Sequence, residues 1–224
     1  MLLIEPLDYI RKNTSAQHKT TIIWMHGLGD SGFGHESIAQ QMNFPDDLGI
    51  TFIFPHAPPI PVTINGGMVM PAWYDILEND ISRKIDESGI EESSVKISQI
   101  IQGEIESGIL PKNIMVAGFS QGGAVALHTA LKYPVQLGGV IAMSTYLGAP
   151  SVLTASTSQI NQSIPIFWGH GTLDPVVPLS LAQESISTLK KSGYTVNYKT
   201  YPMEHSIHPQ EILDIQNWIP RNLI

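Results

Sequence analysis

The sequence predicts an α/β architecture, in which a mostly parallel central sheet carries helices on both faces within one domain over residues 1–224. Short runs of continuously apolar residues recur along the chain, as expected of strands that are covered on both sides. Helical patterns alternate with these runs, which favours parallel strands joined by helices. A chain of 224 residues, 42% hydrophobic and 14% charged, can bury one such core.

The predicted strands share an apolar run bounded by Gly, Pro or polar residues, and all but the last are continuously apolar. They are residues 21–25, 51–54, 114–117, 139–143, 166–168 and 195–200. Helices are predicted over residues 82–106 (interrupted near Gly89), 121–132, 179–191 and 209–218, each with a regular apolar face or a Gly or Pro stop. In parallel sheets, functional residues gather in the loops beyond the carboxyl ends of the strands.

Composition argues against several function classes. There are 12 Lys and Arg against 20 Asp and Glu, a formal net charge of -8, and no basic run exceeds two residues, so a nucleic-acid partner is not expected. Cysteine is absent, which excludes disulfides, thiolate metal sites and a cysteine nucleophile. The opening apolar run, residues 1–4, is too short for a signal peptide, and we expect a cytoplasmic protein.

The strongest motif follows the predicted strand 114–117. Residues 118–123 read GFSQGG, a G-x-S-x-G nucleophile elbow between a strand and a helix. The sharp turn holds Ser120 out at the sheet edge, and the helix directs its positive end toward a developing oxyanion. The alternative is a plain Gly-rich turn; a phosphate-binding loop does not fit, because no Lys follows the glycines.

A serine nucleophile needs a base, and in this class the triad runs in the order Ser, Asp, His. His205 comes directly after the last predicted strand and is the predicted base, whereas His208 precedes Pro209 and is predicted to cap or flank the last helix. Asp174, followed by Pro175, comes after the strand 166–168 and is the predicted acid. The alternative for this aspartate is an ordinary Asp-Pro turn.

Acyl transfer also requires two N–H donors for the oxyanion. One is the backbone N–H after the nucleophile, that of Gln121. The other is expected in the loop after the first predicted strand, within residues 26–30.

With these features, the chain resembles the carboxylesterase/phospholipase family, which includes acyl-protein thioesterases, lysophospholipases and small bacterial carboxylesterases. The matching blocks run in order along nearly the whole chain: HGLGDSG (26–32), FPHAP (54–58), WYD (73–75), GFSQGG (118–123), GTLDPVVP (171–178) and YPMEHS (201–206). The resemblance implies an α/β-hydrolase fold without a large cap domain, and it implies Leu28 and Gln121 as the backbone oxyanion donors. His26 is interpreted as a structural hydrogen-bonding residue.

The segment 64–74 is apolar, contains Gly66-Gly67 and is expected near the active edge. Met68, Val69, Met70 and Trp73 are predicted to bind an acyl chain or to make weak peripheral contact with a membrane, since Met suits adaptable apolar sites. The alternative is a loop folded onto the core. Residues 147–165 form a second candidate rim.

The predicted reaction is hydrolysis of carboxylic esters or thioesters through an acyl-enzyme, without metal or organic cofactor. Expected substrates are small esters, lipids or acyl-proteins, and both a monomer and a homodimer are compatible with the sequence. The alternatives are a peptidase or a cofactor-free haloperoxidase on the same fold, and a catalytically silent binding module.

Overall fold

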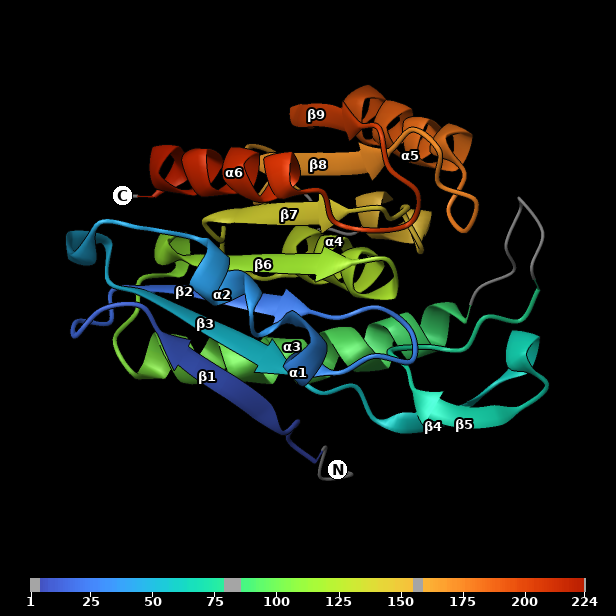
Figure 1. Cartoon of the computed structure of the whole chain (residues 1–224), viewed down its shortest axis with the longest axis horizontal. Coiled ribbons are helices and arrows are strands. Elements are labelled where there is room, and N and C mark those ends of the chain that lie inside the picture. The colour runs from blue at the N-terminus through green and yellow to red at the C-terminus, as the bar shows by residue number, and fades with distance from the viewer. Residues whose placement is uncertain (1–4, 79–85, 155–158, 224) are drawn as a thin grey trace.

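The computed structural model describes residues 5–78, 86–154 and 159–223. Seven strands form one sheet in the order β1-β3-β2-β6-β7-β8-β9 (Figure 1). All neighbouring pairs are parallel except β1 and β3, which are antiparallel at one edge. The predicted fold class, an α/β-hydrolase fold with a mostly parallel sheet, is confirmed.

The strands of the sheet are β1 (Tyr9–Asn13), β2 (Thr20–Met25), β3 (Ile50–Pro55), β6 (Ile114–Phe119), β7 (Gly139–Met143), β8 (Ile166–Gly171) and β9 (Val196–Tyr201). All six predicted strands are present, most of them one to three residues longer than the apolar run. β1 was not among the predicted strands, because its alternating exposed and half-buried residues belong to an edge strand rather than a covered one.

The longer helices are α3 (Glu87–Glu106), α4 (Gln121–Lys132), α5 (Leu179–Lys191) and α6 (Pro209–Trp218), and two single-turn helices are α1 (Gly32–His35) and α2 (Ile38–Gln41). The predicted bounds of α4, α5 and α6 are confirmed. The predicted break near Gly89 is wrong: α3 runs through Gly89, whose N–H is capped by the side chain of Asp86 at 3.0 Å. Residues 82–85 of the predicted helix lie outside the described residues.

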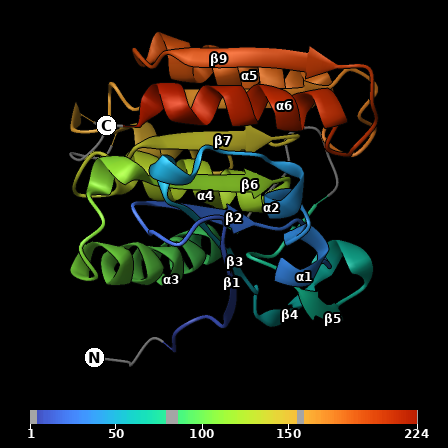
Figure 2. The same cartoon turned by 60° about the vertical axis from the view of Figure 1, so that its left-hand side comes forward.

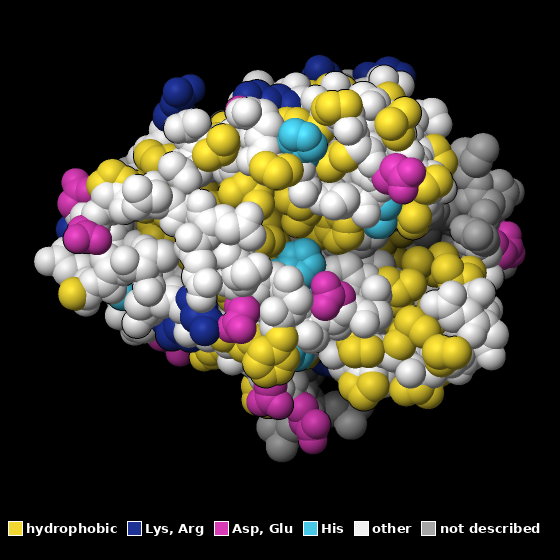
Figure 3. Space-filling view, in the orientation of Figure 1, with side chains coloured by type: hydrophobic (Ala, Val, Ile, Leu, Met, Phe, Trp, Pro, Cys, Tyr) yellow, Lys and Arg dark blue, Asp and Glu magenta, His cyan; other side chains and the backbone are white. Residues whose placement is uncertain are grey.

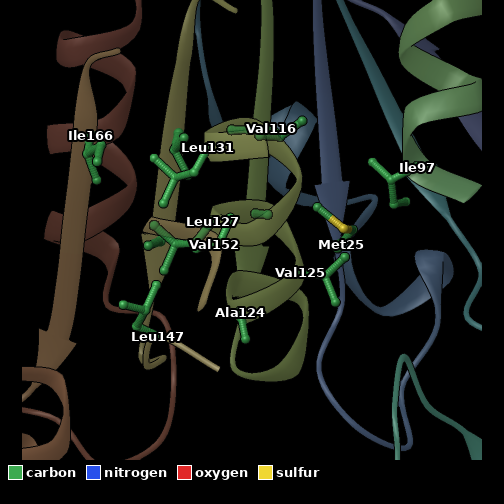
Figure 4. Close-up of a cluster of buried hydrophobic side chains, with 14 of the residues drawn as sticks. Met25, Ile97, Val116, Ala124, Val125, Leu127, Leu131, Leu147, Val152 and Ile166 are labelled. Atoms are coloured by element: carbon green, nitrogen blue, oxygen red, sulfur yellow. The ribbon is translucent and has the colours of Figure 1, made fainter. Parts of the chain in front are cut away.

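Helices cover both faces of the sheet, as the two views of the ribbon show (Figures 1 and 2). On one face, α3, α4 and α5 bury their apolar stripes, and Figure 4 shows part of this layer, in which Ile97, Val125 and Leu127 pack beside Met25 and Val116. On the other face, α2 and α6 pack on alternate residues of the same strands. Because successive side chains of a strand point to opposite faces, one apolar run such as Ile22–Met25 contributes side chains to both cores.

A two-stranded hairpin, β4 (Pro59–Val62) and β5 (Met68–Pro71), stands beside the main sheet. It follows the carboxyl end of β3, so it lies at the edge of the sheet where the predicted functional loops meet. Two glycines with positive φ, Gly66 (68°) and Gly67 (78°), turn the chain between its strands. Within the described residues, no helix has the length and apolar character needed to cross a bilayer.

Candidate active site

Ser120 sits between β6 and α4 in a strained backbone conformation, with φ 54° and ψ −119°. Its N–H donates to the carbonyl of Met143 in the neighbouring strand β7 at 2.9 Å, which holds the turn against the sheet. The flanking glycines are required by space: a Cβ on Gly118 would lie 2.2 Å from the Gly122 carbonyl carbon, and one on Gly122 would lie 2.5 Å from the Met25 oxygen. The GFSQGG motif therefore forms a tight elbow.

The His205 ring lies between Ser120 and Asp174. Its Nε2 lies 3.0 Å from Ser120 Oγ, and its Nδ1 lies 2.7 Å from Asp174 Oδ2. The Phe119 ring, 4.7 Å away between centroids, packs against the imidazole and helps to fix its plane. The three residues predicted from the elbow motif, the chain order and their places after strands therefore lie in one hydrogen-bonded line, from three different loops.

The carboxylate of Asp174 is fully buried and multiply bonded. Its second oxygen, Oδ1, accepts the N–H groups of Val176 at 2.9 Å and Val177 at 2.8 Å. Burial alone would raise the pKa of Asp174, but the hydrogen bond from His205 and these backbone N–H groups outweigh burial and lower it. Asp174 is therefore held as a carboxylate that faces the imidazole.

The loops that carry the acid and the base are bonded to each other. The N–H of Leu173, in the acid loop, donates to the carbonyl of Met203, in the base loop, at 3.0 Å. Ser144 Oγ, directly after β7, donates to the carbonyl of Ser206 in the base loop at 3.3 Å.

His208, by contrast, is the N-cap of α6, where its ring accepts the Gln210 N–H at 3.0 Å. The predicted capping position of His208 is confirmed.

A cavity of about 280 Å³ opens onto the serine and the histidine. It is lined by Leu28 and Gln121, the two predicted oxyanion donors, and by apolar side chains. Gln121 is the first residue of α4, and the first N–H groups of a helix have no acceptor in their own helix. Both residues therefore line the cavity that opens onto Ser120.

The His26 side chain holds the loop of Leu28 through two hydrogen bonds. The Ala57 N–H donates to His26 Nε2 at 3.0 Å, so the proton resides on Nδ1, which donates to the Gly27 carbonyl at 2.7 Å. Burial, partly offset by the Gly27 bond, lowers the pKa of His26 to about 4. The side chain is therefore neutral near pH 7 and has a structural hydrogen-bonding role, as interpreted from the sequence.

The four residues predicted to bind substrate lie in different environments. Met68 and Val69 are exposed on β5, at 63% and 64%, and Met70 is half-buried beside them. Figure 3 shows hydrophobic side chains gathered at the lower right, where Figure 1 places this hairpin. Trp73 lies elsewhere: it is buried, and its indole N–H donates to the His26 carbonyl at 2.8 Å. None of these four side chains is among the described residues that line the cavity.

The apolar wall of the cavity comes instead from residues that were not predicted to bind substrate: Ile64, Ile76, Phe119, Tyr146 and Val176. Ile64 lies in the loop between β4 and β5, and its N–H donates at 3.1 Å to the carbonyl of Ile76, which follows the hairpin. The Gly66-Gly67 pair between two apolar stretches is a hairpin signal, and it would have indicated that the loop of Ile64 joins two paired strands. Tyr146 and Val176 follow β7 and β8 and carry no comparable local signal.

Comparison with known proteins agrees with this architecture. The Phospholipase/Carboxylesterase family model matches residues 10–223. The chain is 38% identical to acyl-protein thioesterase 1 of Cryptococcus neoformans over 232 residues (95% of this chain, 96% of the relative). It is 41% identical to acyl-protein thioesterase 1 of Saccharomyces cerevisiae over 212 residues (92% and 93%).

Among solved structures, that of Arabidopsis thaliana SOBER1 has a TM-score of 0.86 and 37% sequence identity, over 91% of this chain and 98% of that one. SOBER1 of Arabidopsis thaliana, which is also among the sequence relatives, is named a carboxylesterase. Sequence and structure thus agree over nearly the whole length. The chain belongs to the phospholipase/carboxylesterase family of α/β-hydrolases.

Proposed function

We propose that this protein hydrolyses carboxylic esters and thioesters with an apolar acyl chain, using Ser120 as nucleophile, His205 as general base and Asp174 as the residue that orients the base. The observation that carries the proposal is the continuous contact from Asp174 to His205 (2.7 Å) to Ser120 (3.0 Å) at the mouth of an apolar cavity. A serine hydroxyl becomes an effective nucleophile when a neutral imidazole takes its proton.

In the proposed reaction, Ser120 Oγ attacks the substrate carbonyl while His205 Nε2 accepts the hydroxyl proton. The tetrahedral oxyanion is stabilised by the N–H groups of Leu28 and Gln121, and by the positive end of α4. His205 then returns the proton to the departing alcohol or thiol, which leaves an ester on Ser120. Water, deprotonated by the same imidazole, releases the acid and restores the serine.

The cavity supports the choice of substrate class. Its apolar side chains offer an acyl chain a surface against which to bury its methylenes, and each buried methylene contributes about 0.8 kcal/mol at most. The acyl-protein thioesterases among its relatives support thioesters beside oxygen esters. The exposed Met68 and Val69 beside the cavity support a weak contact with lipid, which would bring a membrane-borne acyl chain to the opening.

We further propose that residues 1–224 act as a single catalytic domain. The two hydrophobic cores on either side of the sheet support this, since both are built from elements that span the sequence.

Labelling with a fluorophosphonate probe, followed by peptide mass spectrometry, tests the proposal. Ser120 should be the modified residue, and Ser120→Ala should lose labelling together with about five to six orders of magnitude in kcat on p-nitrophenyl octanoate. Ser144→Ala and Ser206→Ala are the matched controls and should still be labelled. Labelling at either of those serines in the wild type, or an active Ser120→Ala, would refute the assignment.

A further inference from the structure

The Gln121 side chain makes two hydrogen bonds that the proposed reaction does not use. Gln121 is 1% exposed, although it is among the residues that line the cavity. Its Oε1 accepts the backbone N–H of Trp73 at 3.1 Å, and its Nε2 donates to the backbone carbonyl of Tyr74 at 2.8 Å. The carboxamide is therefore bonded at both ends to one short stretch of main chain.

That stretch, Pro71–Tyr74, is also bonded to the other side of the oxyanion site. The Pro71 carbonyl accepts the N–H of Gly29 at 2.8 Å, directly after Leu28, and the Trp73 indole donates to the His26 carbonyl at 2.8 Å. Main chain 71–74 thus lies between the loop that presents the Leu28 N–H and the helix that presents the Gln121 N–H. It connects two donors that are 93 residues apart in sequence.

The start of α4 also lacks the side-chain hydrogen bond that an N-cap residue usually makes. In most helices a Ser at the N-cap bonds through its side chain to an N–H of the first turn. Here the N-cap is Ser120, it makes no such side-chain bond, and its Oγ faces His205 instead. The first turn of α4 therefore takes part of its positional support from the Gln121 carboxamide.

We propose that Gln121 is a positioning residue, whose side chain holds the Leu28 and Gln121 N–H groups at one separation through main chain 71–74. The inference rests on the proposed function, since it concerns the oxyanion site of that reaction. Donors of this kind act in proportion to how well they are placed before the reaction begins. A loosened carboxamide should therefore weaken transition-state binding more than substrate binding.

The test compares Gln121→Met, which keeps the side-chain length but makes neither bond, with Thr129→Val. Thr129 is buried on α4 away from the cavity, and its hydroxyl has no hydrogen-bond partner among the described residues, so its variant controls for a buried substitution in that helix that breaks no hydrogen bond. Gln121→Met should lower kcat by about 10- to 100-fold with KM within twofold. Its affinity for a trifluoromethyl ketone, which forms a tetrahedral adduct with serine, should fall by a similar factor. Values within twofold of those of Thr129→Val would overturn the proposal.

Gln121→Glu decides the question if Gln121→Met does not fold. A protonated carboxyl can accept from Trp73 and donate to Tyr74, but a carboxylate has no proton to donate. The kcat of this variant relative to wild type should therefore be at least tenfold lower at pH 9 than at pH 6, and an unchanged ratio would overturn the proposal. Ser120→Ala separates the two hypotheses: if it is inactive while the Gln121 variants behave as wild type, only the positioning role fails.

Discussion

His205 Nδ1 lies 2.7 Å from Asp174 Oδ2, and this contact determines which imidazole nitrogen faces Ser120. Because the carboxylate oxygen can only accept, Nδ1 must carry the proton, and Nε2 is left with a lone pair toward the serine hydroxyl. Asp174 itself is fixed by the backbone N–H groups of Val176 and Val177, so the direction of its Oδ2 is set by the turn.

Replacing the acid by its amide should reverse this tautomer. In Asp174→Asn, the side-chain NH₂ would face His205 Nδ1, or the turn would have to break its two N–H bonds. We expect kcat to fall by about four orders of magnitude, as in other triads, while the protein remains folded. Steady-state kinetics with p-nitrophenyl butyrate, beside a thermal melt, make the measurement. A loss below tenfold would show that Asp174 does not orient the base.

The two histidines of the last loop should differ sharply in importance. His205→Ala should be nearly as damaging as Ser120→Ala. His208→Ala removes the N-cap bond to Gln210 and the ring stacking on Tyr201, and it should cost about 1 to 2 kcal/mol of stability with little effect on activity. Both variants can be measured with one soluble ester, and an inactive His208→Ala would contradict the assignment.

Much of this site could be predicted because its parts are local in sequence. The elbow, the turn after Asp174 and the loop of His205 each follow a covered strand, and parallel strands bring their carboxyl ends to one edge. The cavity wall could not be predicted in the same way. Tyr146 and Val176 reach the cavity only through the packing of loops after different strands, which no local pattern records.

The hairpin illustrates the same limit. Apolar residues after Gly66-Gly67 indicated contact with an acyl chain or lipid, but the sequence did not separate exposed from buried positions. In the structure, Met68 and Val69 face outward while Trp73 is buried under the oxyanion loop, because the chain leaves β5 and turns into the core between them. Periodicity over four residues is too short to reveal such a turn.

A buried acid on α6 should make stability fall with rising pH. Glu211 is fully buried next to Gly169; Oε2 accepts the His208 N–H, and Oε1 has no hydrogen-bond partner among the described residues. Burial raises its pKa to about 8, with a further contribution from Asp214, against 4.5 for the ordinary group. The folded state thus keeps a proton that the unfolded state releases. Between about pH 4.5 and 8, the free energy of unfolding should decrease by up to about 1.4 kcal/mol per pH unit.

Glu211→Gln removes this titration, because an amide does not ionise, while its carbonyl can still accept from His208. Urea denaturation at pH 6 and pH 8 should show a loss of stability for the wild type and a smaller loss for the variant. Glu184→Gln, at an exposed position on α5, is the matched control and should follow the wild type. Parallel losses in wild type and Glu211→Gln would mean that Glu211 is ionised in the folded protein.

The last prediction separates acyl binding from lipid contact, because the structure places the two on different residues of one hairpin. Ile64 lines the cavity beside Ser120, whereas Met68 and Val69 are exposed on β5. Ile64→Ala should raise KM for octanoyl esters by about tenfold, equivalent to about 1.4 kcal/mol of lost apolar contact, and leave acetyl esters nearly unchanged. An equal loss on both esters would indicate damage to the triad or the fold rather than to an acyl site.

Met68→Ser together with Val69→Ser should have the complementary effect. Co-sedimentation with anionic liposomes should weaken, while kcat/KM for soluble acetyl and octanoyl esters stays within twofold of wild type, because neither side chain reaches the cavity. Leu110→Ser is the matched control: this residue is 56% exposed, but it precedes β6 and so lies at the opposite end of the sheet. Its liposome binding should equal that of the wild type. If the hairpin variant loses octanoyl ester hydrolysis as strongly as Ile64→Ala does, then the exposed strand takes part in acyl binding, and the two functions are not separable.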